Sequence, residues 1–318
     1  MLRGLAVFFA MVVSLIMVST GTVAQRGRSQ RQGPVTIAGA TALTSPALTI
    51  TTEPNAIIWI DDIRRGSTDA SGKLVLAKIL SGRHTLRVRA NGFKEVSTAL
   101  LPGRRTIAVK LVQTTDQAEL LFQQAETAAE QARDEAAKQK AVELYREALK
   151  LRPAFPAAHV GLARVLMDLN NFEEALSEIV AARKTRPIYP EASAVAGRIY
   201  REQAFTDEAI RSFRRAINEG HGFQPEAHVG LARLLEDKGQ FTEAVAEYRK
   251  AIDQLSDSEP VIYQLLGAAY EKLQKPKEAV VAYEKYLELA PNGNLAPAIR
   301  SILDQLKRDA AGQEIIPF

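Results

Sequence analysis

The sequence predicts two structural classes in one chain, a small antiparallel β-sandwich followed by an all-α superhelix of repeated helix pairs. Between residues 47 and 113, apolar residues alternate with polar ones, which indicates strands with one buried face. From Asp116 onward the apolar spacing becomes helical. Within that helical part, the segment AHVGLARVL at 158–166 returns as AHVGLARLL at 227–235. A match of this length indicates a repeated structural unit.

The first 24 residues have the layout of a secretory signal peptide. An apolar run from Leu5 to Val18 follows Arg3, and a small-x-small pattern ends at Ala24, after which we expect cleavage. The alternative is a retained membrane anchor, which the arginines just beyond the site favour. In both cases the sequence predicts an exported protein that is periplasmic or associated with the cell envelope. Residues 25–46 are rich in Gln, Arg, Gly and Thr and predict a flexible linker.

Residues 47–113 predict the β-sandwich. In RHTLRVRA, Leu86 and Val88 alternate with arginines, and in RRTIAVKLV, Ile107, Val109 and Leu111 alternate with polar or small residues. Turn signals that contain glycine separate these runs. Roughly six short strands in such a length are typical of a compact antiparallel sandwich.

Part of this region resembles the PEGA domain family. Glu53-Pro54-Asn55-Ala56 stands where that family has its Pro-Glu-Gly-Ala motif, and GRHTLRV and NGFKE match later features of the family. The sequence departs from the pattern at Asn55, where glycine is common, and at Asp62, where glycine usually follows the aspartate. The resemblance implies an extracytoplasmic accessory domain with no general catalytic activity.

The charges of the chain are divided between its two regions. Residues 47–113 contain 11 Lys and Arg against 5 Asp and Glu, whereas 114–318 contain 26 against 32. A candidate basic face of the β region consists of Arg64, Arg65, Arg87, Arg89, Arg104 and Arg105. Three interpretations stay open for it: a solvated strand surface, a site for acidic glycan or anionic lipid, and a contact with the acidic half of the same chain. Trp59 is interpreted as sheet packing, with a sugar-stacking platform as the alternative.

The helical region repeats with a nearly fixed spacing. Equivalent alanines stand at Ala141, Ala175, Ala209, Ala244 and Ala279, at intervals of 34, 34, 35 and 35 residues. The segment AHVGLAR recurs after 69 residues because it lies two units further on. A single helix pair cannot bury its apolar face, so units of this kind stack on one another. We expect small residues to let the helices of a unit approach closely and aromatic residues to fill the space between units.

These units resemble tetratricopeptide repeats, whose pattern is W-x2-L-G-x2-Y…A-x3-F…P. The last unit fits best, with Tyr263, Leu266, Gly267, Tyr270, Ala279, Tyr283 and Pro291. The resemblance implies five helix–turn–helix units over 114–291. The segment 292–318 predicts a C-terminal capping helix and tail, with Ile299, Ile302, Leu303 and Leu306 at helical spacing.

Three arginines stand one residue beyond the small residue of consecutive units: Arg164, Arg198 and Arg233. The resemblance places them in a groove where peptides dock, so such a ladder would pair with the carboxylates of an acidic peptide. The alternative is pairing within each helix, with the acidic residue four positions later, which is Asp168, Glu202 or Asp237. Such pairs stabilise by only about 0.3–0.5 kcal/mol, so a ligand would displace them and the two interpretations are compatible.

The sequence contains no recognisable catalytic or metal-binding motif. Cysteine is absent, which excludes disulfides and thiol chemistry. His159 and His228 occupy the same place in two units, a place that the family fills with a large packing residue, so we expect core packing. There is no Gly-x-Ser-x-Gly, no phosphate-binding loop and no His-Glu-x-x-His. We therefore expect no enzymatic activity, no cofactor, no metal and no nucleic-acid partner.

Together these features predict a non-enzymatic exported scaffold or adaptor. The groove of the helical region would bind a protein or peptide partner, and the basic β region would localise or orient it. Two alternatives stay open. One is a cell-envelope module that binds acidic glycan or lipid, with the repeats as a spacer. The other is an assembly factor for an outer-membrane or secretion complex.

Overall fold

The computed structural model describes residues 44–312, except 46, 62, 78, 81 and 256–258. The expected signal peptide (1–24) and nearly all of the expected linker (25–46) lie outside this part, so both stay predictions. Among the helices that are described, none combines the length and the apolar character needed to cross a membrane.

The β region consists of short strands arranged in three sheets. The strands are β1 Thr44–Ser45, β2 Leu48–Thr51, β3 Ile57–Ile60, β4 Ile63–Ser67, β5 Lys73–Leu76, β6 Ile79–Leu80, β7 His84–Arg89, β8 Val96–Leu100 and β9 Thr106–Ala108. The larger sheet has the strand order β4-β3-β7-β8 and is antiparallel throughout. A second sheet has the order β5-β2-β9, and β1 pairs with β6.

The two larger sheets share one apolar core, which is compatible with the expected sandwich. Leu48 and Ile50 of β2 are buried together with Ile58 of β3 and Leu86 of β7. The prediction of a wholly antiparallel arrangement is wrong at one pair, since β9 runs parallel to β2 with Ile107 beside Ile50. The chain crosses from one sheet to the other between β8 and β9. Because no hairpin joins β9 to β2, the direction of β9 relative to β2 is not restricted to antiparallel.

The turns around β3 depend on polar side chains. Asn55 has a φ of 55° and Asp61 a φ of 52°, a left-handed conformation that Asn and Asp adopt more readily than most residues. The carboxylate of Asp61 accepts a hydrogen bond from the backbone N–H of Thr85 at 2.8 Å and lies 2.5 Å from Nδ1 of His84. These contacts hold the β3–β4 turn against β7. Asp62 lies outside the described residues.

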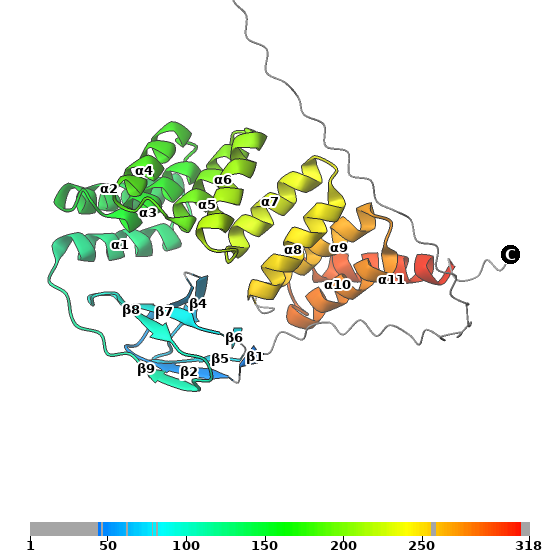
Figure 1. Cartoon of the computed structure of the whole chain (residues 1–318), viewed down its shortest axis with the longest axis horizontal. Coiled ribbons are helices and arrows are strands. Elements are labelled where there is room, and N and C mark those ends of the chain that lie inside the picture. Colours follow the sequence, from blue (N-terminus) through cyan, green and yellow to red (C-terminus); the bar gives the residue numbers. More distant parts are fainter. Residues whose placement is uncertain are drawn as a thin grey trace, which may run out of the picture. The chain divides into compact units, whose positions relative to one another are not determined.

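Five helix pairs and a final helix make up the helical region of the described chain (Figure 1). The helices are α1 Gln117–Gln131, α2 Glu135–Leu151, α3 Pro156–Asp168, α4 Phe172–Thr185, α5 Pro190–Glu202, α6 Thr206–Glu219, α7 Pro225–Asp237, α8 Phe241–Leu255, α9 Pro260–Lys272, α10 Pro276–Leu289 and α11 Ala296–Gly312. Each packs against the next one along the chain. Proline at the first position of α3, α5, α7 and α9 presets the helical φ where no backbone N–H is needed.

Glycines in the first helix of several pairs make room for fully buried aromatic rings. A Cβ atom at Gly197 would lie 2.6 Å from the ring of Phe213, and one at Gly267 would lie 2.6 Å from Tyr283, so each glycine allows close approach within its own pair. A Cβ at Gly230 would lie 2.4 Å from the same Phe213, which belongs to the preceding pair. The expected division between small residues and aromatic fillers is therefore present, and Phe213 fills space both within and between units.

The histidines of the repeated motif join the two helices of their units. Nδ1 of His159 lies 2.5 Å from a carboxylate oxygen of Glu178, and Nε2 lies 2.9 Å from the carbonyl oxygen of Pro153. His228 makes the same contacts with Glu247, at 2.5 Å, and with a backbone carbonyl, at 3.1 Å. Both side chains are largely buried, as expected, and each also links the first helix to the second.

Helix α11 covers the last pair with part of the predicted apolar stripe. Ile299 and Leu303 are buried, and Leu306 packs against the same core. Ile302 is 36% exposed, so its predicted burial is wrong. It lies one position before Leu303, which places it on the flank of the stripe and not at its centre.

Candidate functional site: a groove along the first helices

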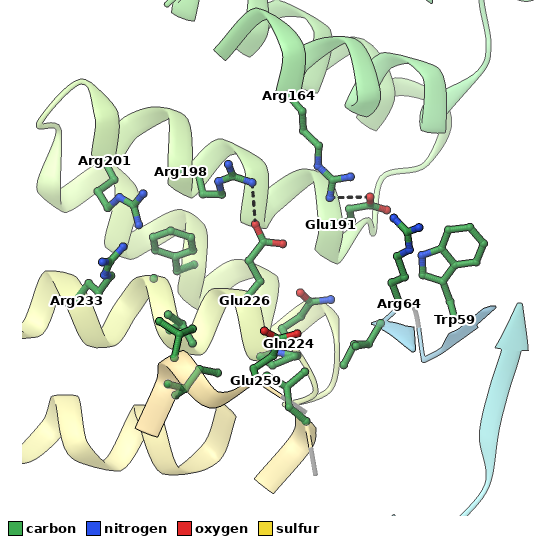
Figure 2. Close-up of a pocket in the computed structure, with 18 of the residues that line it drawn as sticks. Trp59, Arg64, Arg164, Glu191, Arg198, Arg201, Gln224, Glu226, Arg233 and Glu259 are labelled. Atoms are coloured by element: carbon green, nitrogen blue, oxygen red, sulfur yellow. Dashed lines mark hydrogen bonds and ion pairs between the residues drawn. The ribbon is translucent and has the colours of Figure 1, made fainter. Parts of the chain in front are cut away.

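A groove of about 580 Å³ runs along the first helices of consecutive pairs (Figure 2). Helices α1, α3, α5, α7 and α9 line most of it, α6 and α8 contribute Phe213 and Leu255, and the β region contributes Trp59, Ile63 and Arg64. We call it the central groove. Its charged residues from the helical region are Arg164, Arg198, Arg201, Arg233, Glu126, Glu130, Glu191, Glu226 and Glu259, and its apolar residues from that region are Phe213, Pro225, Val229, Leu255, Val261 and Ile262.

The structure places all three arginines of the predicted ladder along this groove. Arg164 comes from α3, Arg198 from α5 and Arg233 from α7. Their equal positions in consecutive units explain this arrangement, because equivalent residues of stacked repeats present the same face. Whether a ligand binds there stays a prediction.

Two of the arginines are paired with the unit that follows. Nη2 of Arg164 lies 2.9 Å from Glu191 of α5, and Nη1 of Arg198 lies 3.2 Å from Glu226 of α7 (Figure 2). Both carboxylates stand at the second position of their helix, directly after proline. There they also interact favourably with the positive end of the helix dipole.

The expected pairs within single helices do not form among the described residues, so that prediction is wrong. Asp168, Glu202 and Asp237 all lie exposed in the last turn of their helices. Glu202 pairs instead with its neighbour Arg201, at 2.7 Å. The ladder arginines that have partners reach across to the next unit, where the carboxylate is closer to the groove.

Glu191 is the more enclosed of the two carboxylates, with a side chain that is 26% exposed against 42% for Glu226. Burial acts to lower the pKa of Arg164, but attraction to Glu191, and then to Glu226 and Glu126, outweighs it and holds this pKa above its ordinary value. Burial acts to raise the pKa of Glu191, but Arg164 and then Arg87 outweigh it and hold this pKa below its ordinary value. Both groups are therefore charged at neutral pH, and their ion pair links α3 to α5.

Arg233 differs from the other two arginines of the ladder. It is exposed and has no ion pair with any residue of the described chain. The cause can be read from the repeats: the position that holds Glu191 and Glu226 after the earlier prolines holds Val261 after Pro260. We call each arginine of the ladder, together with the residue after the proline of the next first helix, a rung. The first two rungs are closed by a carboxylate, and the third rung is open because it has Val261 in that place.

The start of strand β4 forms one wall of the central groove, together with Trp59 of β3. Ile63 packs against the core of the later helices. Arg65 donates hydrogen bonds to the carbonyl oxygens of Gln254, at 3.0 Å, and Leu255, at 3.2 Å, at the end of α8. These carbonyls lack partners within the helix and carry partial negative charge. Burial lowers the pKa of Arg65, and Arg64 forms an ion pair with Glu130 of α1.

Trp59 lies beneath two arginines of the neighbouring strand. The guanidinium carbons of Arg87 and Arg89 are 4.4 and 4.8 Å from the centroid of its ring, distances typical of cation–π contacts. Arg89 is buried and also lies 3.2 Å from Glu126 of α1. The ring is only 9% exposed, which favours the packing interpretation over a sugar-stacking platform.

The six arginines of the predicted basic face do not form one open surface. Arg64, Arg65 and Arg89 contact acidic side chains or carbonyl groups of the helices, and Arg87 attracts Glu191. The remaining two, Arg104 and Arg105, are exposed in the loop between β8 and β9. Of the three interpretations, the contact with the acidic half of the same chain fits these positions.

Sequence reasoning missed the glutamates of the groove. Glu191 and Glu226 each follow the proline that begins a first helix, so the repeated Pro-Glu-Ala at two equivalent positions was the available signal. Glu126 and Glu130 lie in α1, the least regular unit, and nothing in the repeat pattern identifies them. Within the described residues, no three His, Asp or Glu side chains are grouped so that they would hold a metal ion.

The comparison with known families agrees with the repeat pattern. Three family profiles, each described as tetratricopeptide repeat, match residues 132–199, 195–260 and 260–292. The matches run without a gap from 132 to 292, half of the chain, and the chain belongs to the tetratricopeptide repeat family, as the sequence predicts. No curated protein matches the chain.

The chain is also similar to several solved structures. The pilF protein of Pseudomonas aeruginosa is 15% identical with a TM-score of 0.53, covering 61% of this chain and 86% of its own. A thermophilic TPR protein of Thermus thermophilus, TTC0263, is 20% identical with a TM-score of 0.48, covering 59% and 98%. YrrB, a TPR protein with an unusual peptide-binding site, is 16% identical with a TM-score of 0.42, covering 59% and 94%. At these identities the likeness to pilF concerns the fold alone.

Proposed function

We propose that this protein is a non-enzymatic scaffold whose central groove binds a segment of a partner protein. The observation that supports this most is the convergence of Arg164, Arg198 and Arg233 on one groove with an apolar floor. Guanidinium groups bind carboxylates with directed hydrogen bonds, and an apolar floor favours side chains that leave water. The repeats give such a groove a rigid framework.

In this proposal the β region shapes the groove and orients the partner. Arg65 fixes strand β4 to the end of α8, and Arg64 links the same strand to α1. The start of β4 thereby joins the first and the fourth helix pair. The resemblance to the PEGA family and the expected signal peptide add an extracytoplasmic location to the proposal. Binding of acidic glycan or lipid by the β region has less support, because four of the six candidate arginines face the helices.

Affinity capture from cross-linked cell-envelope fractions tests this function. The groove variant is Arg201→Glu/Arg233→Glu, because neither arginine pairs with another unit and the change leaves the structural pairs intact. The matched control is Arg211→Glu/Arg214→Glu, with the same change of charge on the exposed face of α6. Circular dichroism establishes that both variants keep their helices.

We expect one partner protein to be retained by the wild type and the control and to be lost from the groove variant. A partner that all three proteins retain equally would show that binding does not depend on the central groove. The loop that carries Arg104 and Arg105 would then be the next surface to test.

A further inference from the structure

The incomplete rung of the ladder indicates which chemistry the central groove accepts. At the first two rungs, a groove arginine binds a carboxylate that follows a helix-starting proline, at 2.9 Å for Arg164 and 3.2 Å for Arg198. At the third rung Val261 replaces that carboxylate, and Arg233 is left without an ion pair among the described residues. The two closed rungs thus show that the arginines of the groove bind carboxylates.

The surroundings of Arg233 add two further features. Arg201 extends toward the same part of the groove, and its one ion pair among the described residues is with the exposed Glu202 beside it (Figure 2). Val229, four residues before Arg233 on α7, and Val261 of α9 line the same groove, and Val261 is 46% exposed. Arg233, which has no ion pair among the described residues, therefore shares the groove with apolar side chains, of which Val261 is open to solvent.

We propose that this open rung, formed by Arg201, Arg233, Val229 and Val261, is the specificity-determining part of the groove. It binds one Asp or Glu side chain of an extended partner segment, in the place that Glu191 and Glu226 occupy at the other rungs. An aliphatic or aromatic side chain next to that acidic residue covers the two valines. This inference rests on the proposed function and adds the chemistry of the partner to it.

The paired rungs have a different role in this arrangement. Arg164 and Arg198 already have internal carboxylates, so an acidic ligand would have to displace Glu191 or Glu226 and leave it without its cation. Glu191 is partly buried, so leaving it unpaired is costly, whereas Glu226 is exposed and its pair with Arg198 is the easier of the two to open. The open rung carries no such cost, which directs the acidic residue of the partner to Arg233.

The substitution Val261→Glu provides a direct test. It places a carboxylate after Pro260, as in the two preceding units, where it is expected to pair with Arg233 and to benefit from the helix dipole. The open rung then becomes a closed one without removal of any arginine. Val180→Glu is the matched control, since Val180 is an exposed valine of α4 outside the central groove.

The probe is a phage-displayed library of linear twelve-residue peptides, selected on the purified full chain. We expect the selected peptides to share an Asp or Glu next to an aliphatic or aromatic residue. A synthetic peptide from this set should bind roughly tenfold or more weakly to Val261→Glu than to the wild type, because a charge-assisted hydrogen bond is lost. Val180→Glu should bind it like the wild type. The emission of Trp59, the single tryptophan, reports binding because this residue lines the groove.

A second exchange tests the same contact from the side of the ligand. Replacing the acidic residue of the peptide with its amide should weaken binding to the wild type but change nothing for Val261→Glu. If Val261→Glu proves poorly folded by circular dichroism, Arg233→Ala gives the same comparison, since Arg233 is exposed and holds no described ion pair.

The outcomes separate this inference from the proposed function. Selected peptides without an acidic residue, or equal affinity for the wild type and Val261→Glu, would overturn the open rung. If such peptides still fail to bind Arg201→Glu/Arg233→Glu, the groove remains the binding site and the proposed function stands. A selection that returns no peptide dependent on the groove would overturn both.

Discussion

The two copies of AHVGLAR adopt the same packing, yet their arginines have different surroundings. In both copies the histidine joins the two helices of a unit through a glutamate and a backbone carbonyl. In both, the glycine receives an aromatic ring of the preceding unit, Tyr145 at Gly161 and Phe213 at Gly230. Arg164 then pairs with Glu191, whereas Arg233 has no ion pair among the described residues.

This difference shows that the repeated residues specify packing, whereas the following unit determines whether the arginine has an ion pair. The segment itself determines how one helix pair meets its neighbours. The residue that completes each rung belongs to the next first helix, where it is glutamate in one case and valine in the other. A difference at one position of the following unit therefore separates an arginine that is held in an ion pair from one that has none among the described residues.

The largest effects are expected where the copies are alike, at Gly161→Ala and Gly230→Ala. The new Cβ atoms would lie 2.6 and 2.4 Å from ring atoms of Tyr145 and Phe213, which are fully buried and cannot move away. Overpacking costs about 1–3 kcal/mol and is offset in part by the higher helix propensity of alanine, about 1 kcal/mol. Urea denaturation followed by circular dichroism should show that both variants are destabilised.

A double variant serves as the control for this prediction. Phe213→Leu should recover part of the stability that Gly230→Ala loses, because the smaller side chain makes room for the added methyl group. A stable Gly161→Ala next to an unstable Gly230→Ala would break the likeness between the two copies.

The next effect concerns the arginines and should differ between the copies. Arg164→Ala leaves Glu191 without its main cation, so we expect a loss of about 1 kcal/mol in unfolding free energy, the upper end for partly exposed pairs. Arg233→Ala removes an exposed side chain without an ion pair and should change stability by less than about 0.5 kcal/mol. Equal losses in the two variants would contradict the distinction between closed and open rungs.

Local patterns in the sequence were sufficient to predict the helices but not the partners of the groove arginines. The interval of 34 to 35 residues predicted the helix pairs because periodicity and repeat spacing report contacts that every unit makes in the same way. The partner of Arg164 lies in the next unit, and only the stacked geometry brings Glu191 closer to it than Asp168 on its own helix. The same limit explains why an ion pair within the helix was the wrong expectation.

Contacts between distant segments were beyond sequence reasoning altogether. Arg65 and its acceptor Leu255 are 190 residues apart, and no periodic signal links them. The parallel pairing of β9 with β2 likewise depends on how two sheets are connected. The charge distribution left an attraction between a basic β region and an acidic helical region as one of three open interpretations, and it did not show which residues meet.

A smaller effect on the free energy of unfolding should appear when a fall in pH protonates Glu191 in its pair with Arg164. The pKa of Glu191 is held below its ordinary value, so its pair contributes stability above the unfolded pKa of about 4.3 and loses it as the pH falls through the folded pKa. The difference in unfolding free energy between the wild type and Glu191→Gln should therefore shrink as the pH falls from about 5 to about 3. A difference that stays constant over this range would mean that the pair does not stabilise the fold.

The smallest effect is expected at the histidine of the first copy. Burial acts to lower the pKa of His159, but hydrogen bonds to Glu178 and to the carbonyl oxygen of Pro153 outweigh it and raise this pKa above its ordinary value. The charged form is thus favoured in the folded state, so its contribution is complete below about pH 6.5 and is lost as the pH rises through the folded pKa.

Titration of His159 by NMR and unfolding of His159→Gln at several pH values measure this contribution. We expect His159→Gln to lose stability mainly near about pH 6, and the gap to the wild type to narrow toward about pH 8. Glu178→Gln is the matched control, because it keeps the ring but removes the carboxylate that favours its charge. If that variant leaves the pKa of His159 unchanged, the link between the two helices of the unit is a packing contact and not an ion pair.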